Sequence, residues 1–318
     1  MTGFRLLFPA LFALAILPFS SVHAQKANLM AGYLAAPAML PLFVADQAGH
    51  FREEGLGVTS VLFRSGVQVA QTIIAGDVHI GLASPPEVVT AVNAGAKIKG
   101  VWGISNLMPF ALISRSNIRT IHDLKGKKLA ISSHGSLSEF LTQHVLKDKG
   151  VDPRDVTLIA MGGVPTRFAA LVSGAADASL ISSAHFGQAK KEGLNFLFML
   201  SDLIPEWPLD VIYVREDFIA NRDRDLRGFL RAYRRGLITA KAKPDFAIAA
   251  LQKALRYEPA AAAEGYHAYI QSLPEDGYIS ERGMELLIQQ LHESGTIKRK
   301  LALNELFDYR YIREYRKK

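Results

Sequence analysis

Apolar and polar positions recur in one fixed order at two places in the chain. Ile73–Pro85 reads IIAGDVHIGLASP, Leu171–Ser183 reads LVSGAADASLISS, and the two align without a gap. Each stretch reads as the end of a helix, a glycine break, a short apolar strand and then a serine. The matched glycines and serines are Gly76 with Gly174 and Ser84 with Ser182. The pattern therefore predicts one structural unit that occurs twice.

The segments before each copy repeat as well. Each copy follows a strand, a helix that ends near a glycine, and a second strand. These segments are Asn28–Tyr33, Leu40–Glu54 and Thr59–Phe63 in the first copy, and Lys128–Ser132, Leu137–Lys149 and Val156–Met161 in the second. Alternating strands and helices predict two similar α/β lobes. Such lobes bind ligands at loops after the carboxyl ends of parallel strands, so two facing lobes would enclose a cleft.

Four more apolar runs read as strands: Ile98–Ser105, Pro109–Ser114, Asn195–Leu200 and Leu209–Val214. We expect the second of these to lead out of the first lobe and the last to return to it. Two crossings, near Leu112–Ser116 and Trp207–Tyr213, would then form a hinge. The predicted organisation is a lobe I of residues 25–113 and 209–318 and a lobe II of residues 114–208.

The pattern turns helical after the returning strand. The expected helices are Asp217–Lys241, Asp245–Arg256, Pro259–Gln271, Ser280–Ser294 and Leu301–Phe307. Such a run suits helices packed around the first lobe. The predicted fold class is α/β, with two lobes that are each a mainly parallel sheet flanked by helices, joined by a two-segment hinge.

The first 24 residues read as a signal peptide. Arg5 supplies a positive charge, and Leu6–Phe19 is an apolar run too short for a typical membrane span. Val22-His23-Ala24 places small residues where a signal peptidase cleaves, so we expect a mature chain that begins at Gln25. The alternative is a retained membrane anchor. Export with cleavage predicts a soluble protein of the bacterial periplasm.

The amino-acid composition excludes several kinds of site and partner. The 318 residues include no cysteine, which excludes disulfides, thiolate metal sites and cysteine nucleophiles. The formal net charge is +7, and arginines crowd one expected helix between Arg222 and Arg235. A basic face can bind nucleic acid, but export argues against that partner. A solvated face, or a docking surface for a membrane partner, is the favoured interpretation.

The main candidate site follows a predicted strand of the second lobe. Ser133, His134, Gly135 and Ser136 precede the helix expected at Leu137–Lys149. Free N–H groups at a helix start attract anions, and a glycine lets a ligand approach the backbone closely. This predicts a cradle for a carboxylate, sulfonate or phosphate. The alternative is that the serines only cap the helix.

Further candidates occupy equivalent strand ends. Ser84 and Pro85 correspond to the serine at Ser182, although a serine before prolines also suits a helix cap. Ser65 and Gly66, after Arg64, correspond to Gly162 and Gly163, although such glycines also serve turns. Tyr33 and Trp207 are candidate aromatic walls for a flat ligand, although most buried aromatics belong to the core.

The sequence carries little support for catalysis. No HExxH zinc motif, GxSxG elbow or glycine-rich phosphate loop occurs. We therefore expect no catalytic residue, no metal and no cofactor, and a binding protein is the simpler interpretation.

Three motifs carry a family resemblance. PLFVADQAGHF at residues 41–51 with Glu54-Gly55-Leu56, DLKGKKLA at residues 123–130, and GAADA at residues 174–178 resemble periplasmic substrate-binding proteins of the nitrate, sulfonate, taurine and thiamine-precursor type. The similarity covers most of residues 27–201. The sequence departs from this pattern at His79, where the family usually has aspartate, and at His50, where it has an aromatic residue.

The resemblance implies a type II periplasmic-binding-protein fold and an ABC importer. The protein would capture a small organic anion or heteroaromatic compound between its lobes, close around it, and deliver it to a permease with a cytoplasmic ATPase. We expect a monomer. The alternatives are a receptor for an ion-driven transporter, a stand-alone scavenger or sensor, and a periplasmic enzyme like the fungal pyrimidine synthases. Those synthases use cysteine and histidine chemistry, and this chain has no cysteine.

Overall fold

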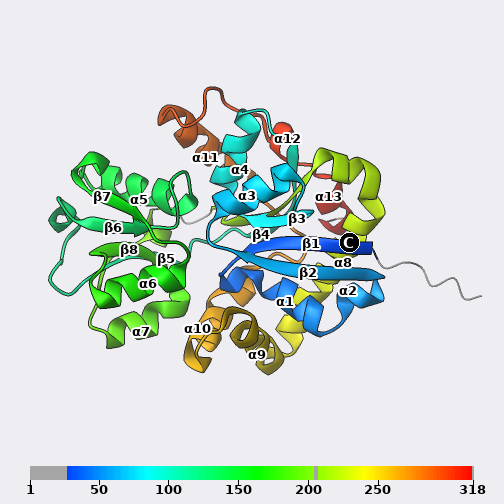
Figure 1. Ribbon diagram of the computed structural model, residues 1–318, viewed down its shortest axis with the longest axis horizontal. Helices are drawn as coiled ribbons and strands as arrows, with labels where there is room; N and C mark the ends of the chain where they lie inside the picture. The colour runs from blue at the N-terminus through cyan, green and yellow to red at the C-terminus, as the bar shows by residue number, and fades with distance from the viewer. Residues whose placement is uncertain (1–26, 204–206, 317–318) are drawn as a thin grey trace, which may run out of the picture.

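The computed structural model describes residues 27–203 and 207–316, so the predicted signal peptide lies outside the described residues. Two sheets form the centres of two lobes, which lie side by side (Figure 1). The first sheet contains β1 (Ala27–Leu34), β2 (Leu56–Phe63), β3 (Ile80–Ala83), β4 (Ile98–Ser105) and β10 (Asp210–Arg215). The second contains β5 (Phe110–Ser114), β6 (Lys128–Ile131), β7 (Thr157–Ala160), β8 (Ala178–Ser182) and β9 (Asn195–Met199). We call the bodies built on them lobe I and lobe II.

The two sheets have equivalent strand orders, β2-β1-β3-β10-β4 and β7-β6-β8-β5-β9. In each sheet the first three strands are parallel, and the fourth strand, β10 or β5, runs antiparallel to both of its neighbours. The predicted fold class, two mainly parallel sheets flanked by helices, is confirmed. The repeat in the sequence is therefore a repeat in the structure.

Helices flank both sheets. Lobe I has α1 (Leu40–Gln47), α2 (His50–Glu53), α3 (Gly66–Ala75) and α4 (Pro85–Asn93), and lobe II has α5 (Leu137–Asp148), α6 (Val164–Ser173) and α7 (Phe186–Lys191). The helix expected at Leu40–Glu54 is interrupted at Gly49, whose φ of +83° ends α1 and starts α2. Short 3-10 turns include η2 (Ile121–Leu124), η4 (Ser183–His185) and η5 (Leu200–Asp202).

The C-terminal helices surround lobe I, as the helical pattern predicts (Figure 1). They are α8 (Glu216–Ala242), α9 (Pro244–Leu255), α10 (Pro259–Tyr269), α11 (Glu281–Glu293), α12 (Leu303–Leu306) and α13 (Arg310–Arg316). In the part of the chain that the structure describes, no helix is long and apolar enough to cross a membrane.

The repeat explains how histidine at position 79 can stand where the resembling family usually has aspartate. The backbone N–H of Met30 donates to Nδ1 of His79 at 3.0 Å, and the backbone N–H of Lys128 donates to the carboxylate of Asp177 at 2.9 Å. The two side chains lie at matching positions of the repeat, after Gly76 and Gly174, which end α3 and α6 with φ of +87° and +79°. The imidazole therefore takes the hydrogen-bonding role of a carboxylate.

The first hinge crossing lies earlier than the sequence predicts. Leu112–Ser114 belongs to β5, which pairs with β8 and β9 in the second sheet. The boundary expected after residue 113 is therefore wrong, because the chain has left the first sheet at Ser105 and joins the second at Phe110. The two crossings are linked, since the N–H of Trp207 donates to the carbonyl of Asn106 at 3.0 Å.

The arginine-rich helix α8 is held by ion pairs. Arg231 contacts Glu54 at 2.7 Å and Arg227 contacts Asp223 at 2.6 Å, while Arg235 pairs with Glu53. Glu53 and Glu54 lie at α2, so Arg231 and Arg235 fasten α8 to α2, whereas Arg227 pairs within α8. Much of the local positive charge is thereby balanced within the fold.

Candidate functional site

A cavity of about 80 Å³ lies between the two lobes. Its lobe I wall comes from residues that follow β1, β2 and β3, and its lobe II wall from residues that follow β6 and β7, together with α5 and α6. These are the carboxyl ends of the parallel strands, where α/β sheets bind ligands. Apolar side chains of Phe63, Phe110, Leu141 and Tyr269 line much of its surface.

Glu87 places a buried carboxyl group in this cavity. It lies in the first turn of α4, and its Oε1 accepts a hydrogen bond from the backbone N–H of Leu137, the first residue of α5, at 3.0 Å. This bond joins lobe I to lobe II. Oε2 has no hydrogen-bond partner in the described residues. Burial raises the pKa of Glu87 to about 8, so the carboxyl group is mostly protonated at pH 7.

Gly66 makes room for this carboxyl group. A Cβ atom added at this position would lie 2.5 Å from Oε1 of Glu87, a distance that side chains do not reach without displacement. The start of α3 therefore packs directly against Glu87. The close approach depends on the missing side chain rather than on a special backbone angle.

Asp210 is a second buried carboxyl group in the cavity. It begins β10, and one oxygen accepts a hydrogen bond from the hydroxyl of Ser84 at 3.0 Å. Burial raises the pKa of Asp210 to about 6, against the opposing effect of this hydrogen bond. Lobe I therefore brings two carboxyl groups to the cavity.

Arg167 brings a buried positive charge from lobe II. It lies on α6 with a relative exposure of 3%, and its Nη1 donates to the hydroxyl of Ser179 at 3.3 Å. Its Nε has no partner within the described residues. Burial lowers the pKa of Arg167 to about 10, which leaves the guanidinium charged at pH 7. A buried guanidinium without a carboxylate partner is costly, which is typical of a ligand site.

Four of the predicted site residues line the cavity: Ser65, Gly66, Ser84 and Gly163. Ser65 also caps α3, where its hydroxyl accepts from the N–H of Gln68 at 3.3 Å. Gly163 precedes α6, and Ser84 uses its hydroxyl on Asp210 rather than as a helix cap. Three of the four come from lobe I and one from lobe II.

The expected cradle at the start of α5 is occupied by carboxyl groups of the protein. The N–H of Gly135 donates to Glu139 at 2.6 Å, and Ser136 caps the helix by accepting from the N–H of Glu139 at 3.4 Å. The N–H of Leu137 is taken by Glu87. His134 is exposed and pairs with Glu139 at 2.8 Å. The N–H groups at this helix start are therefore already used within the described structure, by the side chain of Glu139 and by the mostly protonated carboxyl group of Glu87.

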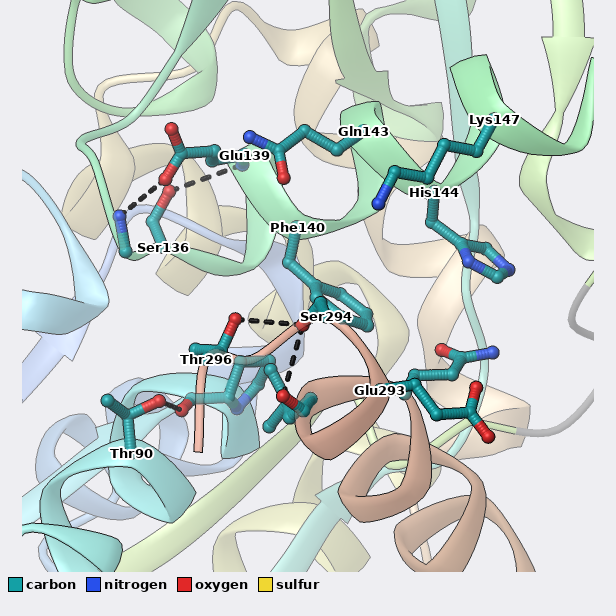
Figure 2. A pocket seen from close by; sticks show the side chains of 14 residues that line it. Thr90, Ser136, Glu139, Phe140, Gln143, His144, Lys147, Glu293, Ser294 and Thr296 are labelled. Atoms are coloured by element: carbon teal, nitrogen blue, oxygen red, sulfur yellow. Dashed lines mark hydrogen bonds between the residues drawn. The ribbon is translucent and has the colours of Figure 1, made fainter. Parts of the chain in front are cut away.

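Gly135 and Ser136 line a different hollow, of about 320 Å³, between α5 and the lobe I helices α4 and α11. Figure 2 shows Phe140 and His144 of α5 directed toward the end of α11, where Ser294 and Thr296 share a hydrogen bond. Glu139, Glu293 and Lys147 make its rim a mixture of charges. The hollow lies between the lobes, but it is separate from the cavity that holds Glu87 and Arg167.

The other predicted site residues lie outside the cavity wall. Tyr33 packs edge-on against Phe43, with ring centroids 5.1 Å apart, and Trp207 is fully buried and stacks on Phe140 at 6.0 Å. Both predicted aromatic walls are therefore core residues. The remaining four are Pro85, Ser133, Gly162 and Ser182.

The sequence prediction missed Glu87, Asp210, Arg167 and Tyr269. The repeat carried a signal for one of them, because residues 66–75 align with residues 164–173 and place Arg167 where the first copy has the buried Val69. An arginine at a core position of a repeat indicates a special environment. Glu87 resembles an ordinary acidic residue in a first helical turn, and Asp210 and Tyr269 come from distant segments.

Comparisons with known proteins bear on the fold and the family. The alkanesulfonate-binding protein SsuA from Xanthomonas axonopodis pv. citri superposes with a TM-score of 0.74 at 20% identity, covering 89% of this chain and 99% of its own. The riboflavin-binding protein RibY of Chloroflexus aurantiacus is 26% identical over 233 residues, which are 72% of this chain and 66% of RibY, just under two thirds. A 4-amino-5-hydroxymethyl-2-methylpyrimidine phosphate synthase of Saccharomyces cerevisiae, THI13, is 24% identical over 163 residues, 50% of this chain and 46% of the synthase.

Two matching lobes with a cavity at their strand ends define the periplasmic-binding-protein fold, as the resemblance in the sequence implies. Residues 36–247 match the family model described as NMT1/THI5 like. The chain belongs to the NMT1/THI5-like family.

Proposed function

We propose that this protein is the periplasmic solute-binding component of an ABC importer. It captures a small organic anion or heteroaromatic compound between its lobes and delivers it to a membrane permease that works with a cytoplasmic ATPase. The observation that carries the proposal is the buried guanidinium of Arg167 in a cavity that both lobes line. An anionic or carbonyl group of a solute would supply the partner that this charge lacks.

Closure of the lobes fits this role. The lobes meet at Glu87 and Leu137, and again where the N–H of Gly187 in α7 donates to Glu264 of α10 at 3.2 Å. Each of these contacts joins one lobe to the other, so together they keep the cavity closed. A solute enters when they separate, and it gains contacts from both lobes when they re-form.

The size of the cavity favours a small solute. About 80 Å³ is well below the roughly 300–1,000 Å³ of pockets that hold drug-sized ligands. A solute of a few heavy atoms fits with little opening, whereas a multi-ring compound requires a wider cleft. We therefore place small anions and single-ring compounds first.

A thermal-shift screen of small carboxylates, sulfonates, aminopyrimidines and flavins tests the proposal. A solute that binds the native state raises the melting temperature, and calorimetry should then give one site per chain. Mass spectrometry after incubation should recover the bound solute unchanged. If no solute raises the melting temperature, the proposal fails.

A second candidate, a pyrimidine-synthase-like enzyme, is favoured by the similarity to the yeast synthase over half of this chain. The same incubation separates the two functions. A product of altered mass, formed in proportion to protein and time, would support the enzyme and contradict a receptor.

A further inference from the structure

The ionisable groups in the cavity are divided between the lobes. Lobe II contributes the guanidinium of Arg167, and lobe I contributes the carboxyl groups of Glu87 and Asp210. All three side chains are more than nine-tenths buried. Arg64, the other arginine that lines the cavity, is exposed.

The lobe II end of the cavity lacks an acceptor. Arg167 has five N–H donors, and the structure gives one of them a partner, the hydroxyl of Ser179. No ion pair joins Arg167 to a carboxylate in residues 27–203 or 207–316, and burial is the cause of its lowered pKa. His185 lies close enough for the positive charge of Arg167 to lower its pKa, so this neighbour does not supply negative charge.

The lobe I end holds two buried carboxyl groups with unused hydrogen-bonding capacity. Asp210 has a pKa of about 6, and Glu87, with a pKa of about 8, stays mostly protonated until a neighbouring cation favours its ionised form. Oε2 of Glu87 is buried without a partner in the described chain, and the nearby charge of Asp210 opposes ionisation of Glu87. The structure gives Asp210 one side-chain donor, from Ser84. Two carboxyl groups that share a buried site favour a neighbouring cation or N–H group.

We propose that the cavity selects an amphoteric solute, with an anionic group held by Arg167 and an ammonium or other N–H group held by Glu87 and Asp210. The inference rests on the proposed solute-binding function and names the class of its solute. Phe63, Phe110 and Leu141 line the same cavity, so the part of the solute between its two polar ends is apolar or aromatic. Each lobe then holds one end of the solute, and closure of the lobes requires both ends to be bound.

Matched compounds test this charge pattern. One set is 4-aminobutanoate, butanoate and butylamine, and a second is 4-(aminomethyl)benzoate, 4-methylbenzoate and 4-methylbenzylamine. Each set contains a zwitterion, the compound with only its anionic group and the compound with only its cationic group. We expect the zwitterion to raise the melting temperature in at least one set and to bind about 10- to 100-fold more tightly than either partner compound, the effect of one charged hydrogen-bonded contact.

Single-residue variants test which side chain holds which end of the solute. Arg167→Met should weaken the zwitterion about 10- to 100-fold and leave the weak binding of the cationic compound unchanged. Glu87→Gln should reduce the preference for the zwitterion over the anionic compound, because an amide cannot ionise beside the ammonium group and only Asp210 remains to do so. Arg154→Met, which removes an arginine with a 90% exposed side chain in lobe II, is the matched control and should bind like the parent. Circular dichroism and melting curves establish that each variant is folded, and Arg167→Lys should restore part of the binding by restoring the charge.

The outcomes separate this inference from the proposed function. If the anionic compounds bind as tightly as the zwitterions, or no zwitterion in either set binds, the amphoteric class is wrong. If another solute from the broad screen binds without dependence on Arg167 and Glu87, the receptor function stands and this inference fails. If no solute binds at all, the proposed function itself fails.

Discussion

Replacing Glu87 by glutamine should remove a pH dependence of stability that the native fold creates. The carboxyl group is fully buried, and its pKa rises from 4.5 to about 8 on folding. The folded protein therefore keeps a proton that the unfolded chain releases between these pH values. The free energy of unfolding falls as the pH rises through this range and levels off above about pH 8. The difference corresponds to about 5 kcal/mol in total, at 1.36 kcal/mol for each pH unit.

The informative window is pH 6.5 to 9. Asp210, whose pKa is about 6, and His185, whose pKa is about 4, titrate mainly below it. Within the window, Glu87 should account for a loss of about 2 kcal/mol of the free energy of unfolding in the parent protein. Glutamine keeps an acceptor for the N–H of Leu137 and offers an N–H in place of the acidic proton, so the variant should lose almost none of this stability.

Urea unfolding followed by circular dichroism at half-unit pH steps measures the effect. Glu264→Gln is the matched control, because Glu264 also accepts a helix-start N–H from lobe II but is partly exposed. The control should keep the decline of the parent protein. Parallel curves for the parent and Glu87→Gln between pH 6.5 and 9 would refute the reasoning that burial keeps this carboxyl group protonated.

Three more predictions follow from single features. Gly66→Ala should destabilise the protein by about 1–3 kcal/mol because its Cβ would displace Glu87. Gly163→Ala is the control and should cost little, since the atom nearest to its added Cβ is 3.7 Å away. Equal melting temperatures for the two variants would contradict this prediction. His79→Leu should lower the free energy of unfolding by about 1 kcal/mol, because it removes the acceptor for the N–H of Met30. His79→Asp keeps an acceptor, and its stability relative to the parent should increase as the pH falls from 7 to 5, because the lowered pKa of His79 means that the parent loses stability on acidification. A difference in urea midpoints between His79→Asp and the parent that stays constant over this pH range would refute the prediction. Mass spectrometry of the periplasmic fraction should find a chain that begins at Gln25, and a mature chain that retains residues 6–19 would overturn the export prediction.

The repeat made the fold predictable from the sequence. The stretches ending at Ser84 and Ser182 place β3 and β8 at matching positions, and the two sheets have the same strand order. The position of β5 was not predictable in this way. Its partners β8 and β9 lie about 70 and 85 residues away in sequence, and no local pattern records which sheet an apolar strand joins.

The site was predictable in outline only. Of the residues expected at strand ends, Ser65, Gly66, Ser84 and Gly163 line the cavity between the lobes, because the carboxyl ends of parallel strands converge; their role in binding stays a prediction. The occupation of the cradle at Gly135 was not predictable, since its N–H groups are taken by carboxyl groups, one of them from a helix about 50 residues away. Local sequence shows that a helix start offers donors, but it does not show which acceptor reaches them.

The distance between the lobes tests the central claim most directly. The chain contains no cysteine, so Lys147→Cys on α5 of lobe II and Gln289→Cys on α11 beside lobe I allow one fluorescent label on each lobe. Single-molecule energy transfer should be recorded with and without the solute that raises the melting temperature most. The account predicts that this solute gathers the molecules into one short-distance population, with a concentration dependence that matches calorimetry. A distance distribution that stays unchanged at saturating solute would contradict capture between the two lobes.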